Sequence, residues 1–283
     1  MSNFRIGIPS KGRLCEQATE LLVAAGLSFR RQDRSLFAQV EELPVDVAFL
    51  RTSDIPVLCA EGAIDLGISG SDVILESGAH VQTRLALGIG KCRLAVLVGE
   101  EDDIQKPEDL DGRRIATKFL RVTSQYLASH DAQAHLVKFN GSIEIMTSLG
   151  VADAMVDIVE TGSTLAANRL RILDEIGHFE SVLLQTEQNT DKDMVDLLVR
   201  RLEGVVIARS YSLLEYNIPR EKLAEAEKIT PGFNSPTVNA LEAPQWCAVR
   251  AMVRRKQAIE AMEKLETLGA SAILETRIAN CRL

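Results

Sequence analysis

The sequence predicts an α/β protein with a two-lobed region, followed by a small α+β domain of the ferredoxin-like type. Three observations support this fold class. Short apolar runs alternate with helical patterns as far as about residue 208. The segments before and after Gly90 form two sets of similar size, and the pattern changes from about Arg209. Because alternating strands and helices usually build parallel sheets, we expect ligands at the carboxyl ends of the strands.

The apolar runs and helical patterns place the elements of the two lobes. In the first lobe we expect strands at 5–9, 45–51 and 65–69 and helices at 14–25, at 54–61 and after 70–72. In the second we expect strands at 94–98, 114–117, 134–139 and 151–159 and helices beginning at 107–110, near 122–129 and around 143–149. The predicted domains are therefore 1–90 and 91–177, with 178–208 returning to the first lobe through a strand at 182–186 and a helix at 191–203.

The last 75 residues, 209–283, have the element order of a separate small domain. We expect helices at 219–228 and 256–268 and strands at 237–241, 247–253 and 270–277. The apolar positions of this segment follow a regular pattern, but none of its residues suggests a catalytic role. A regulatory or oligomerisation role is therefore the natural expectation.

Composition excludes several classes of protein. The chain has 283 residues, 46% of them apolar, and a net charge of −8, which argues against a nucleic-acid surface. Its apolar runs are far shorter than the roughly 20 residues of a membrane span. The first five residues run directly into a strand, so we expect no secretion signal and a cytoplasmic protein. Five widely spaced cysteines indicate reduced thiols rather than a zinc site.

The segment 157–165 is the most informative part of the chain. An apolar run ends in two carboxylates, and a turn of small residues then opens a helical pattern. Uncovered N–H groups at a helix N-terminus bind anions, and carboxylates accept hydrogen bonds from ribose hydroxyls or ligate Mg²⁺. The pattern suits a ribose 5-phosphate; the alternative is an ordinary Ser/Thr helix cap. The residues concerned are Asp157, Glu160, Thr161, Gly162, Ser163 and Thr164.

Basic and small residues also follow other predicted strands. Lys11, Gly12 and Arg13 come after the first strand, and Arg51 follows the second, where Ser53 or Asp54 is expected to cap the next helix. Gly70 and Asp72 follow the third strand, and residues 114–118 repeat this layout in the second lobe. A solvated basic turn is the alternative for each motif alone, but four such strand ends together favour a polyphosphate site.

Nine motifs occur in the order of one known family. They are PSKGRL (9–14), LRTSDIP (50–56), DLGISGSD (65–72), ESGAHVQTRLALGIG (76–90), RIATKF (114–119), NGSIE (140–144), GVADAMVDIVETGSTL (150–165), PGFNSPTV (231–238) and LGASAIL (268–274). The chain thus resembles the long form of ATP phosphoribosyltransferase, the first enzyme of histidine biosynthesis. The resemblance implies a catalytic region like the periplasmic binding proteins and a C-terminal ACT-like domain.

The resemblance also implies a reaction and its residues. The phosphoribosyl group of phosphoribosyl pyrophosphate would pass to N1 of ATP with the help of Mg²⁺, in a homo-oligomer, dimer or hexamer. We expect catalytic roles for Asp157, Glu160, Lys11 and Arg13, binding of phosphoribosyl pyrophosphate by Asp157, Glu160, Thr161, Gly162, Ser163 and Thr164, and binding of ATP by Lys11, Gly12, Arg13, Arg51, Gly70 and Asp72. Inhibitory histidine would bind near Asn217, Ser235, Thr237 and Ala272. Asn217 stands where some relatives have an acid, and its neutral hydrogen bond would be weaker.

Two other functions are compatible with the same architecture. A two-lobed solute-binding or sensor protein shares the expected fold, because fold alone does not determine function. A catalytically silent regulatory subunit of a histidine-pathway complex is the second alternative. A sensor would not need paired acids before a phosphate turn, and a silent subunit would not need the basic strand ends.

Overall fold

A computed structural model describes residues 4–32, 35–139, 149–159, 165, 168–188 and 190–282. Its contacts divide the chain into two compact units. Unit 1 contains Met1–Thr19 and Ser28–Val195, and unit 2 contains Glu20–Leu27 and Asp196–Leu283. The expected domain boundary at residue 209 therefore differs from this division, which places most of the preceding helix in unit 2.

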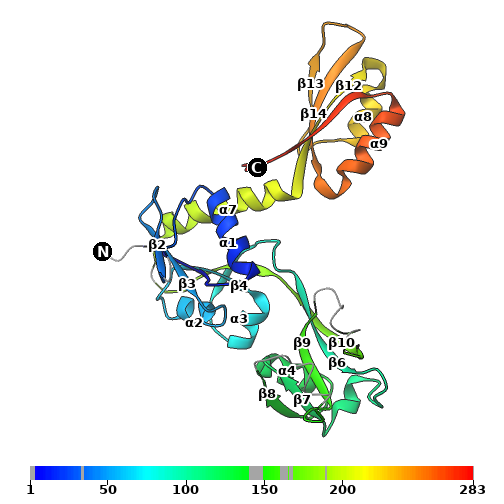
Figure 1. Ribbon diagram of the computed structural model, residues 1–283. Coiled ribbons are helices and arrows are strands. Elements are labelled where there is room, and N and C mark those ends of the chain that lie inside the picture. The colour runs from blue at the N-terminus through cyan, green and yellow to red at the C-terminus, as the bar shows by residue number, and fades with distance from the viewer. Residues whose placement is uncertain are drawn as a thin grey trace. The chain divides into compact units, whose positions relative to one another are not determined.

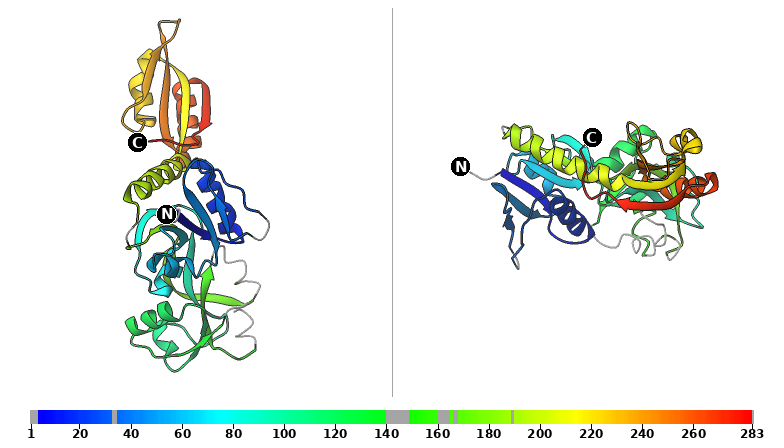
Figure 2. Two further views of the ribbon diagram at one scale, coloured as in Figure 1. Left: turned by 90° about the vertical axis from the view of Figure 1, so that its left-hand side faces the viewer. Right: turned by 90° about the horizontal axis from the view of Figure 1, so that it is seen from above.

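Unit 1 contains two sheets. The six-stranded sheet has the order β2 (Phe37–Gln39), β3 (Val45–Leu50), β1 (Phe4–Pro9), β4 (Leu66–Gly70), β11 (Ser181–Gln185) and β5 (Gln82–Ala86). The five-stranded sheet has the order β10 (Leu170–Phe179), β6 (Cys92–Gly99), β9 (Ala154–Val159), β7 (Arg114–Thr117) and β8 (His135–Lys138). Both are shown in Figures 1 and 2. The two-lobed α/β prediction is thus confirmed, and we call the lobes with six and five strands lobe I and lobe II.

Helices connect the strands of unit 1, and its sheets contain both parallel and antiparallel strand pairs. The helical segments are α1 (Arg13–Ala24, shared with unit 2), α2 (Ile55–Ala60), α3 (Ser71–Ser77), the short 3₁₀ helix η1 (Pro107–Leu110) and α4 (Leu120–Ser129). The expected helix around 143–149 lies almost wholly outside the described residues. The expectation of parallel sheets is confirmed only in part, because both sheets are mixed: β1 is parallel to β3 and β4, but β11 is antiparallel to β4 and β6 to β9. Strands β6 and β11 each begin directly after one of the two chain crossings between the lobes.

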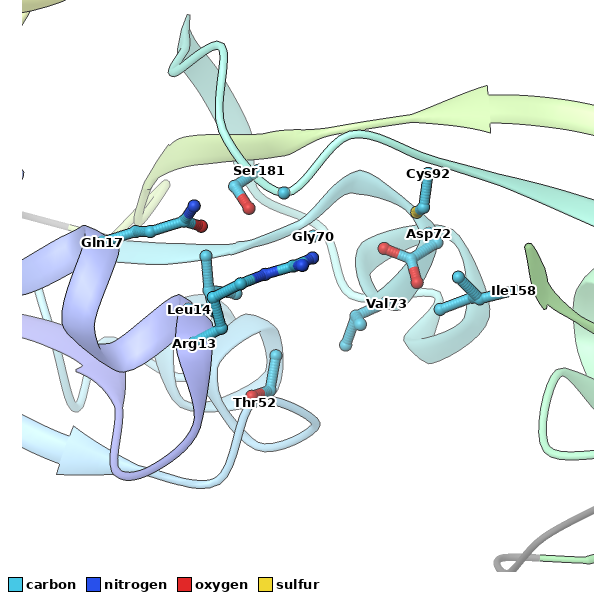
Figure 3. A pocket seen from close by; sticks show the side chains of 11 residues that line it. Arg13, Leu14, Gln17, Thr52, Gly70, Asp72, Val73, Cys92, Ile158 and Ser181 are labelled. Atoms are coloured by element: carbon cyan, nitrogen blue, oxygen red, sulfur yellow. The ribbon is translucent and has the colours of Figure 1, made fainter. Parts of the chain in front are cut away.

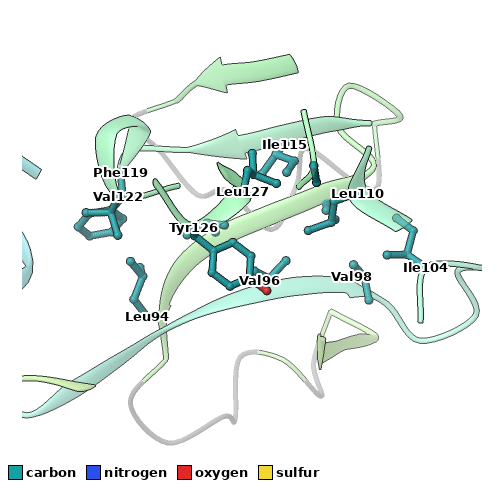
Figure 4. Packing of buried hydrophobic residues seen from close by; sticks show 13 residues of the cluster. Leu94, Val96, Val98, Ile104, Leu110, Ile115, Phe119, Val122, Tyr126 and Leu127 are labelled. Carbon is teal, nitrogen blue, oxygen red and sulfur yellow. The ribbon is translucent and has the colours of Figure 1, made fainter. Parts of the chain in front are cut away.

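Apolar packing holds each lobe together. In lobe II one face of the sheet packs against α4 and η1, with Val96, Ile115, Val122 and Tyr126 among the buried side chains (Figure 4). In lobe I the residues of α2 and the neighbouring strands form a second core. A leucine or isoleucine fully buried in such a core contributes roughly 1.5–3 kcal/mol. Packing in these two cores fixes the positions of the strand ends, where ligands are expected to bind.

Unit 2 contains a four-stranded antiparallel sheet with the order β13 (Thr237–Ala240), β14 (Trp246–Arg254), β12 (Tyr211–Pro219) and β15 (Ser271–Arg277). Its helical segments are α7 (Lys192–Ser210, beginning in unit 1), η2 (Arg220–Lys222), α8 (Leu223–Ile229), η3 (Arg255–Gln257) and α9 (Ala258–Leu268). Helices α8 and α9 lie side by side on one face of the sheet (Figure 1). Strand β12 alternates buried and partly exposed residues and turns Leu214, Tyr216 and Ile218 into the core. The order β-α-β-β-α-β confirms the ferredoxin-like prediction. No helix in the described part of the chain is long and apolar enough to cross a membrane.

Candidate functional site in the two-lobed unit

The carboxyl ends of three strands meet at one edge of the lobe I sheet. Strand β1 pairs in parallel with β3 and β4, so the residues that follow all three come together. The backbone N–H of Ser10 donates to the carbonyl of Leu50 at 2.7 Å and joins the first two strand ends. Lys11 and Arg51 are exposed at this edge. The structure therefore places the predicted basic residues together, as the parallel pairing of these strands requires.

The turn after β1 is held by backbone geometry and by Arg31. Gly12 has φ +79°, a conformation that favours glycine, and its carbonyl accepts the N–H of Cys15 at the start of α1. Arg31 donates from Nη1 to the Ser10 carbonyl at 2.7 Å and stacks over Phe49 at 4.0 Å from the ring centroid. These contacts place Arg13 at the first position of α1.

Arg13 and Asp72 line a cavity of about 390 Å³. The Arg13 side chain extends from the start of α1 toward Gly70 and Asp72 (Figure 3). Lobe II contributes Cys92 and Ile158 to the same cavity. The remaining lining residues are Leu14, Gln17, Thr52, Val73, Gly90 and Ser181. A cavity of this size is within the range of small-molecule sites.

Asp72 is a buried acidic residue at the cavity. It lies in the first turn of α3 with 5% of its surface exposed, and burial raises the pKa of its carboxyl. The backbone N–H groups of Val73 and Asp72 and the charge of Lys118 act in the opposite direction on this pKa. A Cβ on Gly70 would come within 2.1 Å of the Asp72 Oδ1 atom, so a side chain at position 70 would displace the carboxylate.

The strand ends of lobe II bring Lys118 beside Asp157. Thr117 is buried, donates its hydroxyl to the Val156 carbonyl at 2.9 Å and accepts the N–H of Phe119 at 2.9 Å. These bonds tie the end of β7 to β9. The Lys118 Nζ atom consequently lies 3.1 Å from the Asp157 Oδ1 atom. The sequence placed Lys118 among the strand-end residues 114–118 expected at a polyphosphate site, but it did not indicate the pairing with Asp157.

The structure does not describe some of the predicted residues and places others differently from the prediction. Glu160, Thr161, Gly162, Ser163 and Thr164 lie outside the described residues. Asp54 occupies the N-cap position of α2, but its side chain makes no capping bond and instead accepts the Ser53 hydroxyl at 2.9 Å. The expected side-chain cap at this helix is therefore wrong. Gln17, Thr52, Cys92 and Ser181 were not predicted, because only the fold brings them to the cavity.

The two chain crossings between the lobes pass next to the cavity. Gly90 has φ +62°, and a Cβ there would lie 2.5 Å from the Ser181 hydroxyl oxygen. The backbone N–H of Ser181 donates to the Ile89 carbonyl at 2.9 Å, and its carbonyl accepts the N–H of Leu87 at 3.0 Å. The crossings are therefore joined to one another, and Gly90 permits their close approach.

The predicted histidine-binding residues lie on different parts of the unit 2 sheet. Asn217 on β12 pairs with Ser271 on the edge strand β15, next to Ala272. Ala272 has φ +49° and lines a cavity of about 430 Å³ between α9 and β15. Thr237 lies on the opposite edge strand, β13, and Ser235 just before it. The two edges are three strand spacings apart, about 14 Å.

Comparisons with known proteins agree with this architecture. The family model described as ATP phosphoribosyltransferase matches residues 51–204, and the model described as HisG, C-terminal domain, matches residues 208–280. An ATP phosphoribosyltransferase of Rhodopirellula baltica is 63% identical over 282 residues, which is 100% of this chain and 94% of that protein. One of Saccharopolyspora erythraea is 41% identical over 99% of this chain and 100% of that protein.

Among solved structures, the ATP phosphoribosyl transferase (HisG:HisZ) complex from Thermotoga maritima matches with a TM-score of 0.65 and 29% identity. The match covers 72% of this chain and 98% of the other. Similarity over the full length of the chain, together with the cavity between two α/β sheets and the ferredoxin-like domain, leads to one conclusion: the chain belongs to the ATP phosphoribosyltransferase family.

Proposed function

We propose that the protein transfers the phosphoribosyl group of phosphoribosyl pyrophosphate to N1 of ATP, giving N1-(5-phosphoribosyl)-ATP and pyrophosphate in the first step of histidine biosynthesis. The observation that carries this proposal is the 63% identity with an ATP phosphoribosyltransferase over the whole chain. The cavity lined by Arg13 and Asp72 supports it, since it combines a cation for phosphate with a buried acceptor for a nucleotide.

In the proposed reaction the adenine N1 lone pair forms a bond to C1 of the ribose while the bond from C1 to the pyrophosphate oxygen breaks. Pyrophosphate leaves with the electron pair, and positive charge develops on the ribose. The nucleophile needs no strong base, so the protein must position two substrates and neutralise charge. This demand accounts for a site that contains cations and carboxylates.

Each predicted residue receives a role that suits its chemistry. Lys11, Arg13 and Arg51 bind phosphate oxygens, while Gly12, Gly70 and Asp72 shape the nucleotide pocket. Asp157 and Glu160 bind the ribose hydroxyls. The turn residues Thr161, Gly162, Ser163 and Thr164 bind the 5-phosphate through N–H and hydroxyl groups.

Mg²⁺ is the proposed metal, and the carboxylates fit it. Asp72 lines the cavity and Asp157 precedes the lining residue Ile158 on β9, so both offer hard oxygen donors. Mg²⁺ in such sites typically takes one or two carboxylates plus phosphate oxygens and water. Mg²⁺ bound by these carboxylates together with phosphoribosyl pyrophosphate would neutralise part of the negative charge of the pyrophosphate group.

Histidine is the proposed inhibitor, acting on the ferredoxin-like domain near Asn217, Ser235, Thr237 and Ala272. Because these residues belong to opposite halves of one sheet, a site that uses all four requires a second copy of the chain. This separation supports a homo-oligomer, a dimer or hexamer, in which histidine changes the equilibrium between two arrangements. A cytoplasmic location belongs to the same proposal, since both substrates are cytoplasmic metabolites.

In the decisive test, the purified protein is mixed with ATP, phosphoribosyl pyrophosphate and Mg²⁺. Formation of N1-(5-phosphoribosyl)-ATP is then measured by the change in the ultraviolet absorbance of the adenine ring. Formation of the adduct with release of pyrophosphate is expected. Absence of adduct with intact, folded protein would favour a sensor or a silent regulatory subunit.

Asp157→Asn should lower kcat by more than about tenfold, equivalent to about 1.4 kcal/mol of transition-state stabilisation. The neutral amide cannot stabilise positive charge on the ribose as a carboxylate does. Steady-state kinetics with both substrates measure the effect. If the kinetic constants are unchanged, Asp157 does not have the role assigned to it here.

A further inference from the structure

We propose that Lys118 is a positioning residue, which holds the Asp157 carboxylate through one oxygen so that the other is presented to the ribose of phosphoribosyl pyrophosphate. The inference rests on the proposed function and adds a residue to it. It starts from the ion pair between Lys118 and Asp157 at the ends of β7 and β9.

The two oxygens of Asp157 have different surroundings. Oδ1 is buried and accepts no hydrogen bond from the described residues; its contact with Lys118 Nζ, 3.1 Å away, is ionic and lacks hydrogen-bond geometry. The side chain as a whole remains 22% exposed. A ligand can therefore reach this carboxylate only through Oδ2.

Lys118 is held at this place by the structure around it. The hydroxyl of Thr117 ties the end of β7 to β9, and the next residue, Phe119, is 4% exposed in the lobe II core. Lys118 Nζ lies 5.1 Å from the centroid of the Phe119 ring, within the range of a cation–π contact. The Thr117 hydroxyl thus fixes the backbone next to Lys118, and the ammonium group lies beside the buried Phe119 ring.

The same ammonium group acts on both lobes. Its charge lowers the pKa of Asp72, on the lobe I side of the cavity, against the larger effect of burial. One cation therefore acts on two carboxylates from different lobes, Asp72 on α3 and Asp157 on β9. When the ribose binds, Lys118 keeps the negative charge of Asp157 balanced on the Oδ1 side, and Oδ2 accepts from a ribose hydroxyl.

The test compares Lys118→Met, which keeps the length and loses the charge, with Lys118→Arg, which keeps the charge. Lys118→Met should raise KM for phosphoribosyl pyrophosphate about tenfold and leave KM for ATP within about twofold of wild type. Lys118→Arg should recover most of the loss. Lys264→Met is the matched control, because it removes an exposed Lys–Glu pair on α9.

A double mutant shows whether Lys118 acts through Asp157. If it does, Lys118→Met combined with Asp157→Asn should have the same kcat/KM as Asp157→Asn alone. Losses that multiply, a wild-type KM in Lys118→Met, or tighter binding in that variant would each overturn the inference. Thermal unfolding of every variant excludes a general loss of structure.

Calorimetric titration with phosphoribosyl pyrophosphate separates this inference from the proposed function. If the wild type binds the compound but forms no adduct with ATP, the proposed reaction fails and the affinity of Lys118→Met still decides the role of Lys118. A weaker affinity in Lys118→Met supports the inference, and an unchanged one overturns it. If the wild type binds no phosphoribosyl pyrophosphate, both proposals fail.

Discussion

At the scale of single residues, the candidate site depends on carboxylates whose surroundings differ. Asp72 is buried beside the cavity, whereas Asp157 is partly exposed and paired with Lys118. Sequence patterns identified both acids, because Asp72 follows a strand end and Asp157 lies near the end of an apolar run that leads into a turn of small residues. They did not identify the partner of either acid, since Lys118 precedes Asp157 by 39 positions and the two meet only through the pairing of β7 with β9.

Asp72→Asn should stabilise the protein at neutral pH. Burial raises the pKa of Asp72, so the folded state holds the proton more tightly than the unfolded state. This contribution to stability is fully present below the unfolded pKa of about 4 and is lost as the pH rises through the folded value. Neutral asparagine avoids that loss.

Thermal unfolding of wild type and Asp72→Asn at a series of pH values checks this prediction. The melting temperature of the variant should exceed that of the wild type at neutral pH, and the difference should shrink toward pH about 4. A difference that is constant with pH would mean that the asparagine acts through packing alone.

At the scale of elements, the sequence predicted most of the strands and missed four. Three of these, β2, β5 and β10, lie at sheet edges, and the fourth, β12, lies inside the sheet of unit 2. Strand β10 carries Asp174 and Glu175 and contains two register shifts against β6, so its two-residue alternation is interrupted. Helix α7 continues past the predicted end at residue 203, through Gly204, where a Cβ would come within 2.2 Å of the Cys281 carbonyl. That glycine permits close packing of the C-terminal segment and does not end the helix.

Helix α4 is capped by a residue from the other lobe. Its own N-cap, Phe119, has no acceptor side chain, and the Glu76 carboxylate on α3 accepts the N–H groups of Arg121 and Val122 at 3.2 and 3.1 Å. A carboxylate here satisfies two backbone donors and interacts favourably with the helix dipole. The contact links lobe I to lobe II.

Glu76→Ala should therefore lower the free energy of unfolding by about 1 kcal/mol, as loss of a helix cap does. Glu76→Gln keeps an acceptor and should lose less. Urea denaturation measures the stabilities, and hydrogen exchange should show faster exchange of the Arg121 and Val122 amides in the alanine variant. Equal stability of all three proteins would contradict a capping role.

At the scale of the whole molecule, the chain is divided into two compact units, and each contains a hydrophobic core of its own. The cavity and the strand ends belong to unit 1, whereas the ferredoxin-like sheet belongs to unit 2. Leu265 on α9 is fully buried in the core of the ferredoxin-like domain, and Leu184 on β11 is fully buried in that of lobe I. Replacing either leucine by alanine should therefore lower the stability of the unit that contains it, so the two units can be compared through the same substitution.

Leu265→Ala should destabilise the ferredoxin-like domain by about 2–5 kcal/mol, the usual cost of such a cavity. Differential scanning calorimetry should then show an earlier transition for that domain, with the transition of the two-lobed unit little changed. Leu184→Ala is the matched control and should move the other transition. If both variants shift one common transition equally, the units do not unfold independently.

The sequence by itself determined the fold class, the family and the position of the acids, glycines and basic residues at strand ends. Hydrophobic periodicity and turn chemistry, which are local properties of the chain, gave the fold class and these positions, and the order of nine motifs indicated the family. Tertiary structure alone decided that β11 returns antiparallel beside β4, that Glu76 caps α4 and that Lys118 meets Asp157. Each of these contacts joins residues far apart in the chain, and their approach depends on sheet pairing and core packing rather than on local sequence.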